Sequence, residues 1–179
     1  MTVTRGTLLL GLELADLSFI EDADIQSPRG TSNGTLKVAQ HFGQSPTWYD
    51  PQEQGASSIQ QAFTAIFLDF MIGPSAKGMF TYGLAELMEQ TADYTKAAFR
   101  LREGLKFQDG VPITTEDVKW NYENYRGFHA SRLQDKLDDS RADGGIQIVD
   151  DRVIIFHFKE PFIDFIHFYN GVPTGISWI

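Results

Sequence analysis

Hydrophobic and polar positions alternate most clearly in residues 95–102 (TKAAFRLR). In an extended chain, successive side chains point to opposite faces, so this segment has one largely apolar face and one basic face. The apolar face carries Thr95, Ala97, Phe99 and Leu101. The basic face carries Lys96, Arg100 and Arg102. The pattern predicts a half-buried antiparallel strand.

Residues 145–161 (GIQIVDDRVIIFHFKEP) contain two apolar runs separated by Asp150-Asp151. This arrangement predicts a hairpin, and Pro161 suits the first turn of a final helix. Residues 79–83 and 85–90 have weaker strand patterns, and residues 35–40 form a further strand candidate. Residues 57–70 instead place apolar side chains at helical spacing, which predicts an amphipathic helix.

Between these elements, residues 109–117 combine turn and helix-start signals. Asp109-Gly110 is a turn dipeptide, because Gly tolerates positive φ and Asp can bond its own downstream backbone. Thr114 is a predicted N-cap, and Asp117 follows three residues later. Val118, Tyr122 and Tyr125 then fall on one helical face. The segment is predicted to be a strand, a tight turn and a capped helix.

These elements predict an α+β fold in which helices pack on a mixed sheet. We expect Thr95–Arg102 to pair with the 146–158 hairpin, and the 115–125 helix to pack nearby. Residues 1–35 are expected to be a poorly ordered leader and linker, because residues 21–34 are polar and rich in Gly and Ser. Residues 36–179 would form the folded part.

The charge balance excludes some classes of partner. The 179 residues include 15 Lys and Arg against 24 Asp and Glu, a net charge of −9. Without a basic cluster the chain is a poor candidate for binding nucleic acid or an anionic membrane surface. It has no Cys, which excludes disulfides, thiolate metal sites and a lipid-modified cysteine. The apolar run at residues 7–12 is too short for a signal peptide or a membrane span.

No segment predicts catalysis, and we expect neither an enzyme nor a cofactor or metal. Residues 73–79 lack the Lys-Ser/Thr of a phosphate loop, and their glycines are out of step for a nucleophile elbow. The four His lack metal-ligand spacing, and His157 and His167 are interpreted as packing residues. Three carboxylate pairs are assigned to a helix start, a solvated face and a hairpin turn. These are Glu116-Asp117, Asp138-Asp139 and Asp150-Asp151. A hydrolase using these carboxylates remains an alternative without positive support.

The order of these features resembles the extracytoplasmic solute-binding proteins of peptide and nickel ABC transporters (bacterial family 5). The resemblance covers about residues 36–170 and includes Asp50-Pro51 after the first strand candidate. Its motifs are Leu84-Ala85-Glu86, Leu101-Arg102-Glu103-Gly104, Phe107-Gln108-Asp109-Gly110 and Thr115-Glu116-Asp117-Val118.

The resemblance implies part of the first lobe of a two-lobed, type II periplasmic-binding-protein fold. It implies capture of a peptide or similar small solute, a membrane permease as partner, and a periplasmic or cell-surface location. Peptide, nickel chelate and oligosaccharide all remain open as ligands. Because family members are more than twice as long, we expect an N-terminal lobe fragment. A remnant or interaction module that needs a partner half is the alternative.

The resemblance also suggests where a ligand binds. The loop after Asp50-Pro51 contributes first-lobe contacts, so Gly55, Ala56 and Ser57 are the candidate ligand-binding residues. The alternative for this loop is a plain helix entry, with Ser57 or Ser58 as N-cap. A single lobe is expected to bind peptides weakly, and to self-associate through an exposed aromatic surface at Phe162–Tyr169.

Overall fold

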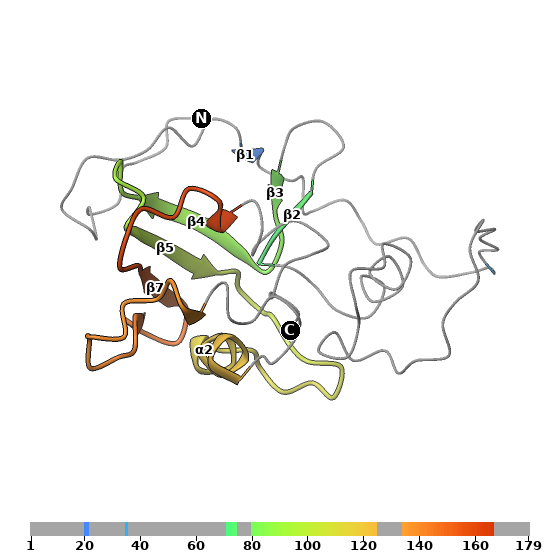
Figure 1. Cartoon of the computed structure of the whole chain (residues 1–179). Coiled ribbons are helices and arrows are strands. Elements are labelled where there is room, and N and C mark those ends of the chain that lie inside the picture. Colours follow the sequence, from blue (N-terminus) through green and yellow to red (C-terminus); the bar gives the residue numbers. More distant parts are fainter. Residues whose placement is uncertain (1–19, 22–34, 36–70, 75–79, 125–133, 167–179) are drawn as a thin grey trace, which may run out of the picture.

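A computed structural model describes residues 20–21, 35, 71–74, 80–124 and 134–166 (Figure 1). The strand expected at residues 35–40 (apart from residue 35), the helix expected at 57–70 and nearly all of the expected leader lie outside these residues. The domain boundary expected at residue 35 therefore stays a prediction.

The main feature is a four-stranded antiparallel sheet with the order β4-β5-β7-β6. Its strands are β4 (Ala85–Gln90), β5 (Lys96–Leu101), β6 (Ile146–Ile148) and β7 (Val153–His157). Figure 1 shows β4, β5 and β7 side by side. The pairing expected between residues 95–102 and the 146–158 hairpin is confirmed.

The register explains why β5 and β7 form the centre of this sheet. Phe99 lies opposite both Leu87 on β4 and Ile154 on β7, and Ala97 lies opposite Phe156. Cross-strand apolar pairs of this kind stabilise a sheet by roughly 0.2–1 kcal/mol each. The apolar face predicted from the alternation is therefore the face that builds the core.

A second, three-stranded sheet has the order β1-β3-β2. It consists of β1 (Ile20–Glu21), β2 (Ile72–Pro74) and β3 (Phe80–Tyr82), with β1 parallel and β2 antiparallel to β3. The Met71 carbonyl, just before β2, accepts hydrogen bonds from the amides of Gly83 and Ala85 at 3.1 and 3.0 Å. These bonds join the small sheet to the start of β4, and the parallel pair makes the β-structure mixed, as predicted.

The Asp109-Gly110 turn is confirmed. The amide of Gly110 donates to the Phe107 carbonyl at 2.9 Å, and Gly110 has a φ of 92°. The carboxylate of Asp109 accepts a bond from the Val111 amide at 2.9 Å. Gly supplies the positive φ and Asp the local acceptor that the turn requires.

Helix α2 (Thr115–Asn124) follows this turn and packs beside β6, on the side of the sheet away from β4 (Figure 1). At its start, Asp117 accepts bonds from both the amide and the hydroxyl of Thr114, each at 2.8 Å. The cap therefore differs in detail from the prediction, because the Thr114 hydroxyl donates to a carboxylate instead of accepting from a helix amide. Val118 and Tyr122 are buried as expected, whereas Tyr125 lies outside the described residues.

One hydrophobic core lies between the sheets, α2 and the segment after β7. Its fully buried aromatic members include Phe99, Tyr122, Phe156 and Phe165. Tyr122 and Phe156 meet edge to face with ring centroids 4.8 Å apart. Such contacts add about 0.5–1.5 kcal/mol beyond the burial of apolar area.

The expectation of an exposed aromatic surface at Phe162–Tyr169 is wrong for Phe162, Phe165 and Ile166, which are buried. The chain after β7 folds back on the sheet, and the Phe162 amide donates to the Tyr94 carbonyl at 3.0 Å. The ring of Phe165 then lies 4.7 Å from that of Phe158. This chain itself provides the cover that we expected from the rest of the protein.

The helix expected at Pro161 begins later. Phe165 and Ile166 are the first helical residues, and the continuation lies outside the described residues. The Phe165 amide closes a turn on the Phe162 carbonyl at 3.2 Å.

Candidate functional site

The predicted ligand-binding residues Gly55, Ala56 and Ser57 lie outside the described residues, so their assignment stays a prediction. The described residues show instead what the family-like motifs do. Arg102 donates from its guanidinium to the Gly83 carbonyl at 2.9 Å and from its amide to the Leu84 carbonyl at 3.0 Å. The motif residues thus join strands, close a turn and cap a helix. They build a scaffold.

An open depression lies between the end of β5 and the β6–β7 turn. Its volume is about 460 Å³, and it is lined by Arg100, Asp150, Asp151, Arg152 and Val153. Arg152 is fixed there, because its Nε and Nη2 donate to the Leu101 carbonyl at 3.0 and 2.9 Å. Its Nη1 pairs with Glu103 at 2.8 Å.

The chemistry of this depression is charge pairing. The Asp150 carboxylate already accepts the amides of Arg152 and Val153, both at 2.8 Å. Arg100 is exposed and forms no ion pair with any residue in the described part of the chain. None of the lining side chains is a hydroxyl, thiol, amine or imidazole. The depression can therefore contact a charged group at Arg100.

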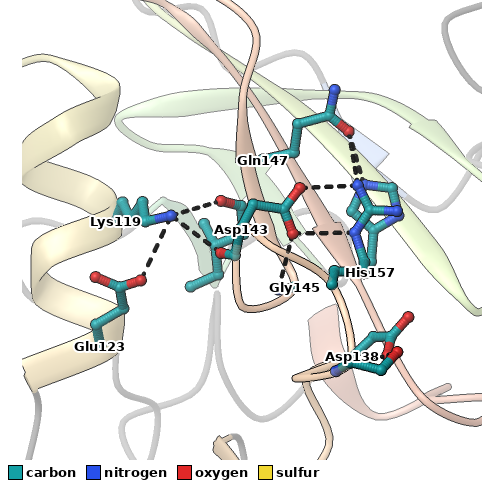
Figure 2. A network of polar contacts seen from close by, with 10 residues as sticks. Lys119, Glu123, Asp138, Asp143, Gly145, Gln147 and His157 are labelled. Carbon is teal, nitrogen blue, oxygen red and sulfur yellow. Dashed lines mark hydrogen bonds and ion pairs between the residues drawn. The ribbon is translucent and has the colours of Figure 1, made fainter.

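A second polar cluster connects β6, β7 and the turn before β6 (Figure 2). Arg141 Nε and Nη2 bond the two carboxylate oxygens of Asp143 at 3.0 and 2.8 Å. Arg141 Nη2 also reaches Gln147 Oε1 at 3.3 Å, and the same oxygen lies 2.9 Å from His157 Nε2. The bond from Arg141 lowers the pKa of the Asp143 carboxyl, and the Gly145 amide adds to this effect.

Burial governs His157. The side chain is only 7% exposed, and desolvation, reinforced by the positive charge of Arg141, lowers its pKa. The neutral imidazole is therefore favoured, and it is hydrogen-bonded to Gln147. This confirms that His157 is a satisfied packing residue. The cluster lies against the sheet and holds its turns together.

Lys119 attaches α2 to this cluster. Its ammonium donates to the main-chain carbonyls of Asp143 and Ile146, each at 3.0 Å, and lies 3.5 Å from Glu123 (Figure 2). Sequence reasoning missed this contact, because nothing in the local pattern links a helix lysine to carbonyls 24 and 27 residues away. It also missed the depression, although the charged face predicted for residues 95–102 pointed to Arg100.

The carboxylate pairs have the local roles assigned to them at the helix start and the hairpin turn. Within the ranges that the structure describes, no three His, Asp or Glu side chains are grouped to hold a metal ion. No helix in the described part of the chain is long and apolar enough to cross a membrane.

Comparison with known proteins shows which family this scaffold resembles. Residues 80–177 match the family described as bacterial extracellular solute-binding proteins, family 5, middle region. The periplasmic oligopeptide-binding protein OppA of Haemophilus influenzae is 26% identical over 154 residues, which are 75% of this chain and 28% of OppA.

Two solved structures show the same fold. The murein tripeptide binding protein MppA of Escherichia coli has a TM-score of 0.58 at 17% identity, over 71% of this chain and 28% of MppA. NikA of Brucella suis, in complex with Fe(III)-EDTA, has a TM-score of 0.58 at 18% identity, over 73% of this chain and 25% of NikA. This chain therefore shares part of a type II periplasmic-binding-protein fold.

The chain spans about a quarter of the length of these relatives. The family match nevertheless covers more than half of the chain itself, and it includes β3 to β7, the Asp109-Gly110 turn and α2, whereas β1 and β2 precede it. The chain belongs to the bacterial extracellular solute-binding proteins, family 5.

Proposed function

We propose that the chain is part of the substrate-binding component of an ABC transporter, in its first lobe. It would capture a peptide or a similar small solute for import through a membrane permease, in the periplasm or at the cell surface. It would act by binding and not as an enzyme. The family match over residues 80–177 is the observation that carries this proposal.

The mechanism we propose is hinge closure of two lobes around the solute. An extended peptide would pair its main chain with strands of the lobe, while roomy pockets accept its side chains. Gly55, Ala56 and Ser57 would line the first-lobe side of this site. Small side chains at these positions would allow the peptide backbone to approach closely.

Residues 1–35 would be a leader and linker, and residues 36–179 would contribute one wall of the binding site. A ligand that contacts one wall remains half solvated, yet it still loses conformational freedom on binding. Loss of half of the contacts costs about 4 kcal/mol, roughly a thousandfold in affinity. These 179 residues by themselves are therefore expected to bind peptides no tighter than about millimolar.

The test is a titration of the isotope-labelled chain with a mixed pool of short peptides, followed by two-dimensional NMR. We expect weak, saturable shifts at the amides of Gly55, Ala56 and Ser57. The amides of Gly144 and Gly145 serve as internal controls that do not move. Micromolar binding would show that this chain is a complete receptor. Shifts confined to Arg100 and Arg152 would move the ligand site to the depression.

A remnant or interaction module that needs a partner half is the second candidate. The chain's span of about a quarter of its relatives favours it. The same titration separates the two candidates, because a module without solute-binding capacity would show no peptide-dependent shift at any amide.

A further inference from the structure

Two side chains share the amide oxygen of Gln147 on β6. His157 Nε2, at the end of β7, lies 2.9 Å from Gln147 Oε1 (Figure 2). Arg141 Nη2, from the turn before β6, lies 3.3 Å from the same oxygen. A guanidinium can only donate hydrogen bonds, so the group that faces Arg141 must be the oxygen of the amide and not its nitrogen. Arg141 therefore fixes the orientation of the Gln147 side chain.

The orientation of Gln147 fixes in turn the tautomer of His157. An amide oxygen can only accept, so His157 Nε2 must carry the hydrogen of this contact. In the neutral ring Nδ1 then keeps a lone pair, and it forms no hydrogen bond with any group in the described part of the chain. A further proton must therefore enter at Nδ1, which charges the ring without breaking its bond to Gln147.

The charged groups around His157 decide what a charged ring would meet. They are the cations of Arg141 and Lys96 and the carboxylates of Asp143 and Asp138. Both carboxylates are already engaged, because Asp143 pairs with Arg141 and Asp138 accepts the amide and hydroxyl of Ser140. Among the described residues, an imidazolium at this position would thus face a guanidinium without a free carboxylate beside it. Burial, and then the charge of Arg141, lower the pKa of His157.

The contact between Arg141 and Gln147 is the weakest bond of this cluster. Its length of 3.3 Å exceeds the ordinary range, whereas Arg141 bonds Asp143 at 3.0 and 2.8 Å and His157 bonds Gln147 at 2.9 Å. The Arg141 side chain is also 34% exposed, so its guanidinium can turn toward water and keep its ion pair with Asp143. Repulsion from a charged His157 should therefore break the Arg141–Gln147 contact first.

His157 also holds both ends of the turn that carries Arg141. Its carbonyl accepts the amide of Asp138 at 2.9 Å, and its amide donates to the Gly145 carbonyl at 2.8 Å. Inside the turn, the Asp143 carbonyl accepts the ammonium of Lys119 on α2 at 3.0 Å. Release of Arg141 would thus loosen the middle of a turn that is fastened at its two ends and that attaches the helix.

We propose that residues 138–145 form an acid-sensitive latch, in which protonation of His157 at Nδ1 releases Arg141 from Gln147. At neutral pH the shared oxygen holds the middle of the turn against β6. In acid the main-chain bonds of His157 keep the ends of the turn in place while Arg141 turns outward. The latch is separate from the capture of a solute, and it does not depend on it.

The test follows His157 and Arg141 by NMR in the isotope-labelled full chain, from about pH 7.5 to about pH 4.5. We expect the Nε2–H tautomer at the upper end and titration at Nδ1. A nuclear Overhauser contact between the Arg141 guanidinium and the Gln147 side-chain amide should disappear as His157 becomes charged. An Nδ1–H tautomer, a His157 that stays neutral over the whole range, or a contact that survives its protonation would overturn the proposal.

A charge variant with a matched control makes the test specific. Gln147→Glu places a carboxylate between the two cations, so the midpoint of the His157 titration should rise by about 1 pH unit, a tenfold gain in proton affinity. Arg141 should then stay in contact with residue 147 in acid. Gln108→Glu adds the same charge at an exposed position in the Asp109-Gly110 turn and should titrate like the parent. Equal midpoints in the two variants would show that the shared acceptor does not control His157, and the latch would be refuted.

Discussion

Thr115 and Asp150 are joined by a hydrogen bond of 2.6 Å, from the Thr115 hydroxyl to the Asp150 carbonyl, although 35 residues separate them. Thr115 is the first residue of α2 and is fully buried. Its amide also donates to the Asp151 carbonyl at 3.2 Å. The start of the helix is thereby fastened to the β6–β7 turn, which explains why a Thr opens the Thr-x-Asp-Val helix of this chain.

Thr115→Val should destabilise the fold by about 1–2 kcal/mol, because it removes this donor while keeping the size of the side chain. The matched control is Thr95→Val, whose hydroxyl bonds the exposed carboxylate of Asp93 at 2.8 Å. The free energy of unfolding from urea titrations measures both. An equal loss in the two variants would mean that the buried bond to Asp150 does not fasten the helix.

Gly110→Val should reduce stability more than Glu103→Ala does. A Cβ at Gly110 would meet no atom within 4 Å, so the loss comes only from a β-branched residue at a φ of 92°. That strain is about 1–3 kcal/mol. Glu103→Ala removes an exposed ion pair with Arg152, which contributes about 0–1 kcal/mol. Equal melting temperatures would contradict the turn assigned to Asp109-Gly110.

Gly144 and Gly145 are adjacent and both have positive φ, yet substitution should affect them differently. A Cβ at Gly145 would lie 2.7 Å from the Asp138 amide nitrogen and 2.9 Å from the His157 carbonyl oxygen. A Cβ at Gly144 would meet nothing within 4 Å. Gly144→Ala should cost about 1–2 kcal/mol from backbone strain alone.

Gly145→Ala should cost about 1–3 kcal/mol more than Gly144→Ala, because the backbone of two neighbouring segments must shift. Chemical denaturation of the two single variants provides the comparison. If the two losses are equal, the close approach of residues 138 and 157 to Gly145 does not constrain the turn.

The strands could be predicted because their hydrophobic alternation is local. Residues 96–101 carry the alternation and residues 153–157 form a short apolar run, each within five or six positions, and their pairing follows from a hairpin packing on a neighbouring strand. The burial of Ala98, on the face predicted to be basic, could not be predicted. It arises because β5 has neighbours on both sides, Glu89 on β4 and Ile155 on β7.

Contacts of charged side chains with main-chain groups far away in the sequence could not be predicted either. The guanidinium of Arg152 bonds the Leu101 carbonyl across 51 residues, and a main-chain acceptor leaves no mark in the sequence. The depression beside Arg100 therefore becomes visible only in the fold. The burial of Phe162 and Phe165 was missed for a related reason, since the aromatic composition of a segment does not show which part of the chain covers its side chains.

The titration of His157 should make stability depend on pH in a defined window. Its pKa in the folded chain lies below the ordinary value of 6.5, first because burial disfavours the cation. Arg141 and Lys96 lower the pKa further, whereas Asp143 and Asp138 oppose them. Between the folded and unfolded pKa values the unfolded chain binds more protons. The free energy of unfolding therefore falls as the pH drops below about 6.5, and it levels off below the folded pKa.

His157→Gln keeps a hydrogen-bonding side chain but cannot titrate, so this part of the pH dependence should disappear. The pKa of Asp143 is also lowered, but its contribution is lost only below the ordinary value of 3.8, in a separate range. The free energy of unfolding is measured for the parent and the variant from about pH 5 to about pH 7.5, a range around the ordinary pKa of histidine. The difference between the two curves isolates the contribution of His157. Parallel curves would mean that His157 is protonated equally in the folded and unfolded chains, and that its burial at the end of β7, beside Gln147 of β6, exerts no control over its charge.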